Sequence, residues 1–327
     1  MLQVRVQADR ITFDAGFQVV FERTLRIPDD GKTYPLPPGL GAFPIKRVQD
    51  YAARVPAHWV EQGGVFIPMY QREAMWLRFA TPGRLPHAIK VAVGKVNAVS
   101  GESWDQALRK EKKDYLVSPP QPWLDGINAG KDMIRQFVAM PLGMGYTVEA
   151  QVTGEETVGG LQMIVYAPKP GFVLPRPVAR RRGVMFAKSA AMGGAEMGLG
   201  AGGKMHQKIY PDPHGIDTWD PENYGRVFVH IVNSLAYREI TGEEPPPTPV
   251  TAQTYAQYKL PWYDLYDEHM ADTGAPQNLQ DVKSIKEMDA AKGFAPQQDD
   301  TPVDVPDGQV IKYPLSDDGS RVNDGDW

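Results

Sequence analysis

The chain has 327 residues and a formal net charge of −5, with 42% hydrophobic and 23% charged residues, which are ordinary values for a globular protein. It contains no cysteine, so disulfides, thiolate nucleophiles and cysteine zinc sites are excluded, and the small charge without a dominant basic face argues against a nucleic-acid partner. The 30 prolines and 32 glycines exceed the average share and indicate many turns and ordered loops, which favours a β-rich fold over a helical bundle.

The N-terminal stretch MLQVRVQADRITF alternates polar and apolar residues and lacks the apolar core of a signal peptide. No run approaches the roughly 18 apolar residues that a membrane span needs. We therefore expect a cytoplasmic protein without a membrane span.

Alternating apolar residues predict a β-rich portion over residues 1–168, forming a mainly antiparallel sheet or sandwich. Glycine-bearing connections separate the last three of the expected strands, which predicts a meander. A short helix interrupted at Pro56 is expected over residues 49–60. The expected strands cover residues 2–6, 17–27, 73–79, 87–99, 134–140, 146–152 and 161–166.

Residues 169–203 lose this regularity and predict a loop, first rich in proline and arginine and then in methionine and glycine. Its run of Arg180, Arg181 and Arg182 is a candidate partner-binding surface. One candidate partner is the acidic C-terminal segment, residues 295–327, of the same or another subunit. A solvated basic loop that binds no partner is an equally favoured interpretation.

The strongest helix signal covers residues 221–241. Asp220 and Pro221 suit the start of a helix, and Gly242 supplies the usual stop. At 100° per residue, six residues share one broad apolar face: Val227, Phe228, Ile231, Val232, Leu235 and Ala236. This helix would organise a helical portion over residues 204–294, with further helices at 251–258, 261–270 and 278–292. The result is an α+β fold in which the sheet and a helical C-terminal section share one core, followed by the acidic segment with one strand within 309–315.

A glycine pattern at residues 198–204 suggests nucleotide binding. Gly198, Gly200 and Gly203 satisfy G-x-G-x-x-G, and Lys204 completes G-x-x-x-x-G-K. However, Met205 replaces the hydroxyl residue that would hold magnesium, and two prolines obstruct a following helix. A chance match within a glycine-rich tract is the favoured interpretation.

Carboxylates and imidazoles gather in residues 204–220, where His206, Asp212, His214 and Asp217 are candidate ligands of a divalent cation. Their spacing fits neither an EF-hand nor a helical zinc signature, and an ordinary turn region rich in Asp and Pro is the favoured alternative. No cofactor is expected, with a divalent metal kept as the one candidate. Such a site would support a metal-assisted or carboxylate-based hydrolase.

Five further side chains have a candidate role. His230 and Tyr237 lie near each other on the polar strip of the expected helix and suit acid–base catalysis, although a histidine with a satisfied hydrogen bond is the favoured interpretation. Trp123 with Asp125 is an aromatic–acid pair suited to a carbohydrate or peptide groove, as is Trp219 with its neighbour Asp220. Tryptophans that anchor the core are the favoured alternative.

No catalytic signature stands out in the sequence. We therefore expect a non-catalytic assembly or binding protein that self-associates through the loop at 169–203 and the acidic tail. A hydrolase using residues 204–220 and a nucleotide binder using residues 198–204 are the alternatives.

Overall fold

The computed structural model describes residues 1–172 and 196–312, except residues 8, 15, 84, 110, 112, 249, 265–269 and 275. Among these residues, hydrogen bonds link seventeen strands into one large sheet, in which most pairs are antiparallel. The prediction of a β-rich, mainly antiparallel fold is confirmed. Its strands are β1 (Val4–Gln7), β2 (Arg10–Phe13), β3 (Gln18–Thr24), β4 (Thr33–Tyr34), β5 (Gly39–Ala42), β6 (Lys46–Arg47), β7 (Val65–Met69), β8 (Ala74–Ala80), β9 (His87–Val93), β10 (Val96–Asn97), β11 (Leu116–Ser118), β12 (Trp123–Leu124), β13 (Gly126–Gly130), β14 (Met133–Pro141), β15 (Leu161–Pro168), β16 (Glu196–His206) and β17 (Trp219–Asn233).

The described helices are short and lie outside this sheet. They are α1 (Ala57–Gln62), α2 (Val148–Thr153), α3 (Ser234–Thr241), α4 (Ala252–Gln257), α5 (Gln277–Gln280) and α6 (Ile285–Ala291), with 3₁₀ turns η1 (Val48–Tyr51), η2 (Ile216–Thr218), η3 (Gln298–Asp300) and η4 (Asp307–Gln309). A separate parallel pair joins β18 (Trp262–Asp264) to β19 (Val310–Lys312). None of the described helices is long and apolar enough to cross a membrane.

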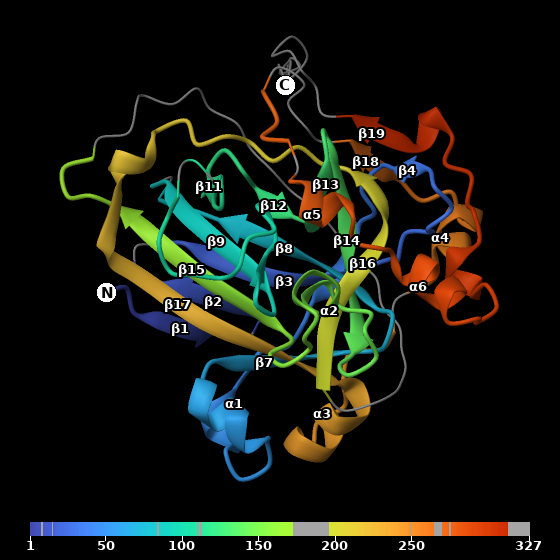
Figure 1. Cartoon of the computed structure of the whole chain (residues 1–327), viewed down its shortest axis with the longest axis horizontal. Coiled ribbons are helices and arrows are strands. Elements are labelled where there is room, and N and C mark those ends of the chain that lie inside the picture. The colour runs from blue at the N-terminus through green and yellow to red at the C-terminus, as the bar shows by residue number, and fades with distance from the viewer. Residues whose placement is uncertain are drawn as a thin grey trace, which may run out of the picture.

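The large sheet folds over so that two layers enclose the core. Strands β11, β9, β15 and β17 form one layer, which crosses in front of β2 and β3 in Figure 1. Strands β2, β3, β8, β14 and β16 form the other, and the layers join where Met197 of β16 pairs with Ile231 of β17. The largest cluster of buried apolar side chains extends along the chain from Ile11 to Val303. The C-terminal residues therefore share the core of the sheet.

The predicted helix at residues 221–241 is wrong over most of its length. Residues 219–233 form β17, which pairs with β15 and β7. The apolar arc looked wide because a strand covered on both faces carries consecutive apolar residues, and such a run does not distinguish strand from helix. Helix α3 begins only after Asn233, whose side chain accepts a hydrogen bond from the Leu235 amide, and it ends at the predicted Gly242.

The predicted loop at residues 169–203 is also wrong where its glycine tract is described. Residues 196–206 form β16, which pairs with β14 over most of its length. A Cβ atom on Gly203 would lie 2.5 Å from the Pro28 carbonyl oxygen, and one on Gly200 would lie 2.9 Å from the Tyr146 carbonyl oxygen. The tract is glycine-rich because neighbouring backbone approaches too closely for side chains.

Other differences are local. Residues 146–152, predicted as a strand, contain α2, which Thr147 caps and Gly154 ends in the left-handed conformation. The helix predicted at 261–270 contains β18, and residues 265–269 lie outside the described part. The helix at 278–292 divides into α5 and α6, and the one at 49–60 into η1 and α1. Because the C-terminal helices are short and separate, the predicted helical C-terminal section is only weakly supported.

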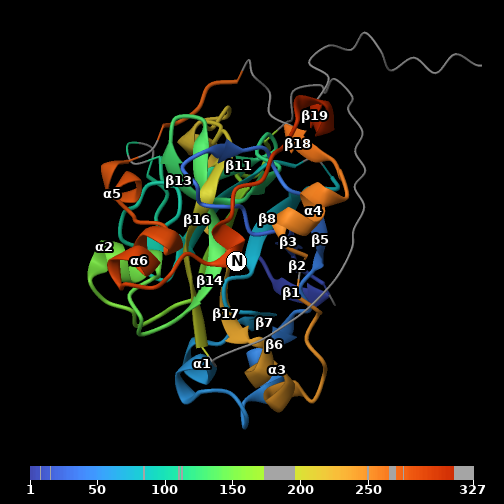
Figure 2. The same cartoon turned by 90° about the vertical axis from the view of Figure 1, so that its right-hand side faces the viewer.

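Part of the acidic C-terminal segment is held against the sheet by two arginines from the N-terminal quarter. Arg26 pairs with Asp299 and, at 2.8 Å, with Asp300. Arg72 pairs with Asp289 at 2.8 Å and with Asp299 at 3.0 Å. Helix α6, which carries Asp289, lies next to β14 and β16 in Figure 2. The segment thus meets Arg26 and Arg72, whereas the predicted partners, Arg180, Arg181 and Arg182, lie outside the described residues.

Candidate ligand-binding site

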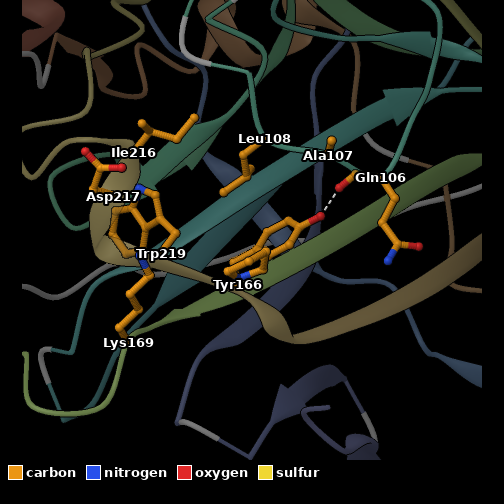
Figure 3. Close-up of a pocket in the computed structure, with 9 residues that line it drawn as sticks. Gln106, Ala107, Leu108, Tyr166, Lys169, Ile216, Asp217 and Trp219 are labelled. Atoms are coloured by element: carbon orange, nitrogen blue, oxygen red, sulfur yellow. Dashed lines mark hydrogen bonds between the residues drawn. The ribbon is translucent and has the colours of Figure 1, made fainter.

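A pocket of about 460 Å³ opens at the end of the front layer where β15 finishes and β17 begins (Figure 3). Three segments that are far apart in the sequence form it: residues 106–108, 166–169 and 216–221. Its lining consists of Gln106, Ala107, Leu108, Tyr166, Lys169, Ile216, Asp217, Trp219 and Pro221. It therefore contains two residues that the sequence indicated, Asp217 and Trp219.

Two aromatic side chains, Tyr166 and Trp219, form the floor of the pocket, and each is only 2% exposed. The Tyr166 hydroxyl donates to the Gln106 carbonyl oxygen, and the Trp219 indole nitrogen donates to Asp212 at 2.9 Å. Burial raises the pKa of Tyr166 above its ordinary value. Because both polar groups are already bonded, the floor offers mainly carbon to a ligand.

Asp212 supports this floor from behind. One of its carboxylate oxygens accepts from the Tyr115 hydroxyl at 2.8 Å and from Trp219, while the other accepts from the His214 amide at 2.8 Å. The His214 ring meets Trp219 edge-on with centroids 5.9 Å apart. Asp212 and His214, both predicted as metal ligands, thus hold the aromatic floor in place.

A buried lysine fixes the opposite wall. Lys90 on β9 is 1% exposed, and its ammonium donates to Asp105 at 2.9 Å, to Asp114 at 2.8 Å and to the Ala107 carbonyl oxygen at 2.5 Å. It also lies 5.6 Å from the centre of the Trp104 ring. A buried charge with this many partners is strongly anchored, so the loop that supplies residues 106–108 is fastened to the sheet.

The rim of the pocket carries charges of opposite sign. Lys169 and Asp217 are exposed, and neither forms an ion pair with another residue of the described chain. Their backbones are tied together, because the Lys169 amide donates to the Thr218 carbonyl oxygen at 2.8 Å. In Figure 3 the two side chains lie on opposite sides of the Trp219 indole.

The four predicted metal ligands are not brought together. His206 is exposed at the end of β16, Asp212 and His214 support the floor, and Asp217 lies on the rim. Within the described residues, no three His, Asp or Glu side chains are grouped closely enough to hold a metal ion.

His230 lies on β17 far along the strand from the pocket. Its ring stacks between Trp59 and Phe228, with centroids 4.3 Å away on each side, and Nε2 donates to the Gly63 carbonyl oxygen at 3.0 Å. Burial lowers the pKa of His230 to about 4, so the ring is neutral at physiological pH. Tyr237 is fully buried in α3, and burial raises its pKa. Both side chains contribute to packing at this end of the sheet.

Trp123 and Asp125 lie outside the pocket. Trp123 belongs to the main core and meets Trp76 edge-on at 6.3 Å. Asp125 is buried, accepts a hydrogen bond from the Gln207 amide at 2.8 Å, and has a pKa that burial raises to about 8. Of the predicted ligand-binding residues, only Trp219 lines the pocket.

The predicted phosphate loop is part of β16. Gly198 pairs with Met140, Gly200 with Val138 and Lys204 with Arg135. Phosphate loops bind through backbone amides that are turned toward the anion at the start of a helix. In the described structure these glycines lie within a paired strand, and no helix follows β16 directly.

Sequence reasoning did not find Leu108, Tyr166 or Lys169, because they belong to no local motif and meet only in the folded chain. Comparisons with protein-family models, curated proteins and solved structures give no significant match to this chain.

Proposed function

We propose that the protein is a non-catalytic binding protein whose ligand occupies the pocket at Trp219. One observation supports this most: a rigidly held aromatic floor lies beneath a rim with one cation and one carboxylate, neither of which forms an ion pair with a described residue. Small-molecule sites are usually clefts of about 300–1,000 Å³ with an apolar lining and a few polar groups. The pocket fits that description in both volume and lining.

The same site offers little to a catalyst. Nucleophilic or acid–base chemistry needs a reactive group within hydrogen-bond reach of a base and of the substrate. The Tyr166 hydroxyl is bonded to a carbonyl oxygen, and Asp212 is occupied by three donors behind the floor. Binding without turnover is therefore the function that the pocket supports best.

Filling the pocket tests this proposal. Ala107 is exposed on the rim, and only its backbone oxygen contacts Lys90, so Ala107→Phe inserts a ring without removing an anchoring bond. We expect compounds that raise the melting temperature of the wild type to lose this effect in Ala107→Phe. Thermal-shift measurements with amino acids, dipeptides, monosaccharides and nucleotides provide the readout.

The matched control is Ala53→Phe, which places the same ring on an exposed turn after η1. This variant should keep every shift that the wild type shows. Shifts that survive in Ala107→Phe, or the absence of any shift in the wild type, would contradict the proposal.

We also propose self-association, which a second observation favours. The described part of the predicted loop pairs with β14, and the described part of the tail pairs with Arg26 and Arg72. By contrast, three exposed apolar side chains lie at α4, β18 and β19, which are neighbours in Figure 2. There Tyr258 is 73%, Ile311 48% and Leu260 40% exposed. Light scattering should give a dimer or larger assembly at micromolar concentration, reduced by Tyr258→Ser with Ile311→Ser. A monomer would end this proposal.

A further inference from the structure

We infer that the ligand of the Trp219 pocket is a zwitterion whose ammonium and carboxylate groups are separated by an apolar body, as in a short peptide. This inference rests on the proposed binding function and gives it a ligand class. It follows from the floor, the rim charges and their relative placement.

The floor determines the middle of the ligand. The hydroxyl of Tyr166 and the indole nitrogen of Trp219 both donate within the protein, and Leu108 and Ile216 add aliphatic surface to the lining. A polar group placed there would lose its hydrogen bonds to water without replacing them, which costs free energy. The part of the ligand that lies over the floor should therefore be hydrocarbon or aromatic.

The rim determines the ends of the ligand. Some exposed charges elsewhere on the surface form pairs: Arg109 meets Asp105 at 2.6 Å, and Lys95 meets Glu155 at 3.3 Å. Lys169 and Asp217 form no such pair with described residues, although their backbones are joined through Thr218. A ligand with a carboxylate near Lys169 and an ammonium group near Asp217 would give each of these side chains an ion-pair partner.

The placement of the two charges favours a molecule longer than one α-amino acid. Lys169 and Asp217 extend on opposite sides of the Trp219 indole in Figure 3, whereas the charged groups of an α-amino acid share one carbon atom. A dipeptide separates its termini and carries side chains that suit the floor. A purely anionic ligand would be repelled by Asp217, and a neutral sugar would leave both charges without partners.

Calorimetry with three related probes tests this ligand class on the intact protein. The probes are leucyl-phenylalanine, its N-acetyl form and its C-terminal amide, each of which lacks at most one charge. We expect each modified probe to bind about fivefold more weakly than the free dipeptide, which is the upper range for an exposed ion pair.

Two charge-removing variants assign each end of the ligand. Lys169→Met should weaken binding of the free dipeptide about fivefold and make it indifferent to amidation. Asp217→Asn should do the same and make it indifferent to N-acetylation. The matched controls are Lys131→Met and Asp307→Asn, two exposed residues outside the pocket lining, and both should bind like the wild type.

The outcomes separate the ligand class from the binding function. If all three probes bind equally and Ala107→Phe abolishes their binding, the proposed zwitterionic ligand class is wrong, but the pocket still binds ligands. If the probes bind equally to the wild type and to Ala107→Phe, both proposals are wrong. If no probe binds while a monosaccharide or a nucleotide does so in an Ala107-dependent way, the ligand class again fails and the binding function stands.

Discussion

Strands β16 and β17 are paired at one end, yet they are built from opposite kinds of residue. Four glycines of β16, at positions 198, 200, 202 and 203, let the backbones and side chains of its neighbours approach closely. Strand β17 instead fills space with β-branched side chains such as Val229 and Ile231, which are at most 1% exposed. A strand can thus be specified either by missing side chains or by large ones. The glycine content predicted a loop for the first, and the wide apolar arc between capping residues predicted a helix for the second.

Of the substitutions in these two strands, the largest effect should come from adding one carbon atom to β16. A Cβ atom on Gly203 would meet the Pro28 carbonyl oxygen at 2.5 Å and that of Ile27 at 2.9 Å, and backbone cannot move aside cheaply. We expect Gly203→Ala to lower the free energy of unfolding by about 3 kcal/mol, at the upper end for overpacked cores. Urea unfolding measures this change.

Gly308→Ala is the control for the glycine prediction, because a Cβ atom there meets nothing within 4 Å and its backbone needs no positive φ. It should change stability by less than about 0.5 kcal/mol. Equal stabilities of Gly203→Ala and Gly308→Ala would show that β16 does not need the Pro28 and Ile27 backbone to lie this close to Gly203.

Removing two carbon atoms from β17 should cost less. Val229 is fully buried between β15 and β7, so Val229→Ala leaves a cavity and loses the burial of two methyl groups. The expected loss is about 2 kcal/mol, measured by the same urea unfolding. A loss larger than that of Gly203→Ala would reverse the comparison between the two strands.

The sequence predicted many of the strands but not which distant residues they contact in the folded chain. Strands β3, β8, β9, β14 and β15 were found because their apolar residues alternate or cluster between turns. The glycines of β16 carry no local sign of the neighbours that require them, such as Pro28, which is distant in the sequence. The same limit applies to the pocket: Trp219 and Asp217 stood out, whereas Tyr166 and Lys169 acquire their place only when β15 pairs with β17.

A buried acid next to the end of β16 should make stability fall as the pH rises. Gln207, which follows β16, bonds to Asp125, and burial raises the pKa of Asp125 to about 8 from 3.8. Between these values the folded protein keeps a proton that the unfolded chain has lost. Because of Asp125, the unfolding free energy should therefore decrease by about 1.4 kcal/mol for each pH unit that the pH rises in this range.

Asp125→Asn keeps the shape of the side chain and cannot ionise. Between about pH 5 and 8 this variant should therefore lose the part of the slope that Asp125 causes. Identical slopes in Asp125→Asn and the wild type would mean that Asp125 ionises as freely in the folded protein as in the unfolded chain.

An effect of the opposite sign should come from a buried base on β17. Burial lowers the pKa of His230 to about 4 from 6.5, so between these values the unfolded chain binds a proton that the folded protein excludes. Stability should fall by about 1.4 kcal/mol per pH unit as the pH drops from 6.5 to 4. His87 is buried with its pKa also lowered to about 4, and it should contribute an equal share.

His230→Gln retains an amide donor for the Gly63 carbonyl oxygen and removes the titration, so it should halve the acid slope that the two histidines cause. His87→Gln should lower the slope by the same share, because it removes the other buried imidazole. Urea midpoints measured from pH 4 to 7 distinguish these outcomes. An undiminished slope in His230→Gln would place the acid sensitivity outside β17, and the stacking between Trp59 and Phe228 would then tolerate a charged ring.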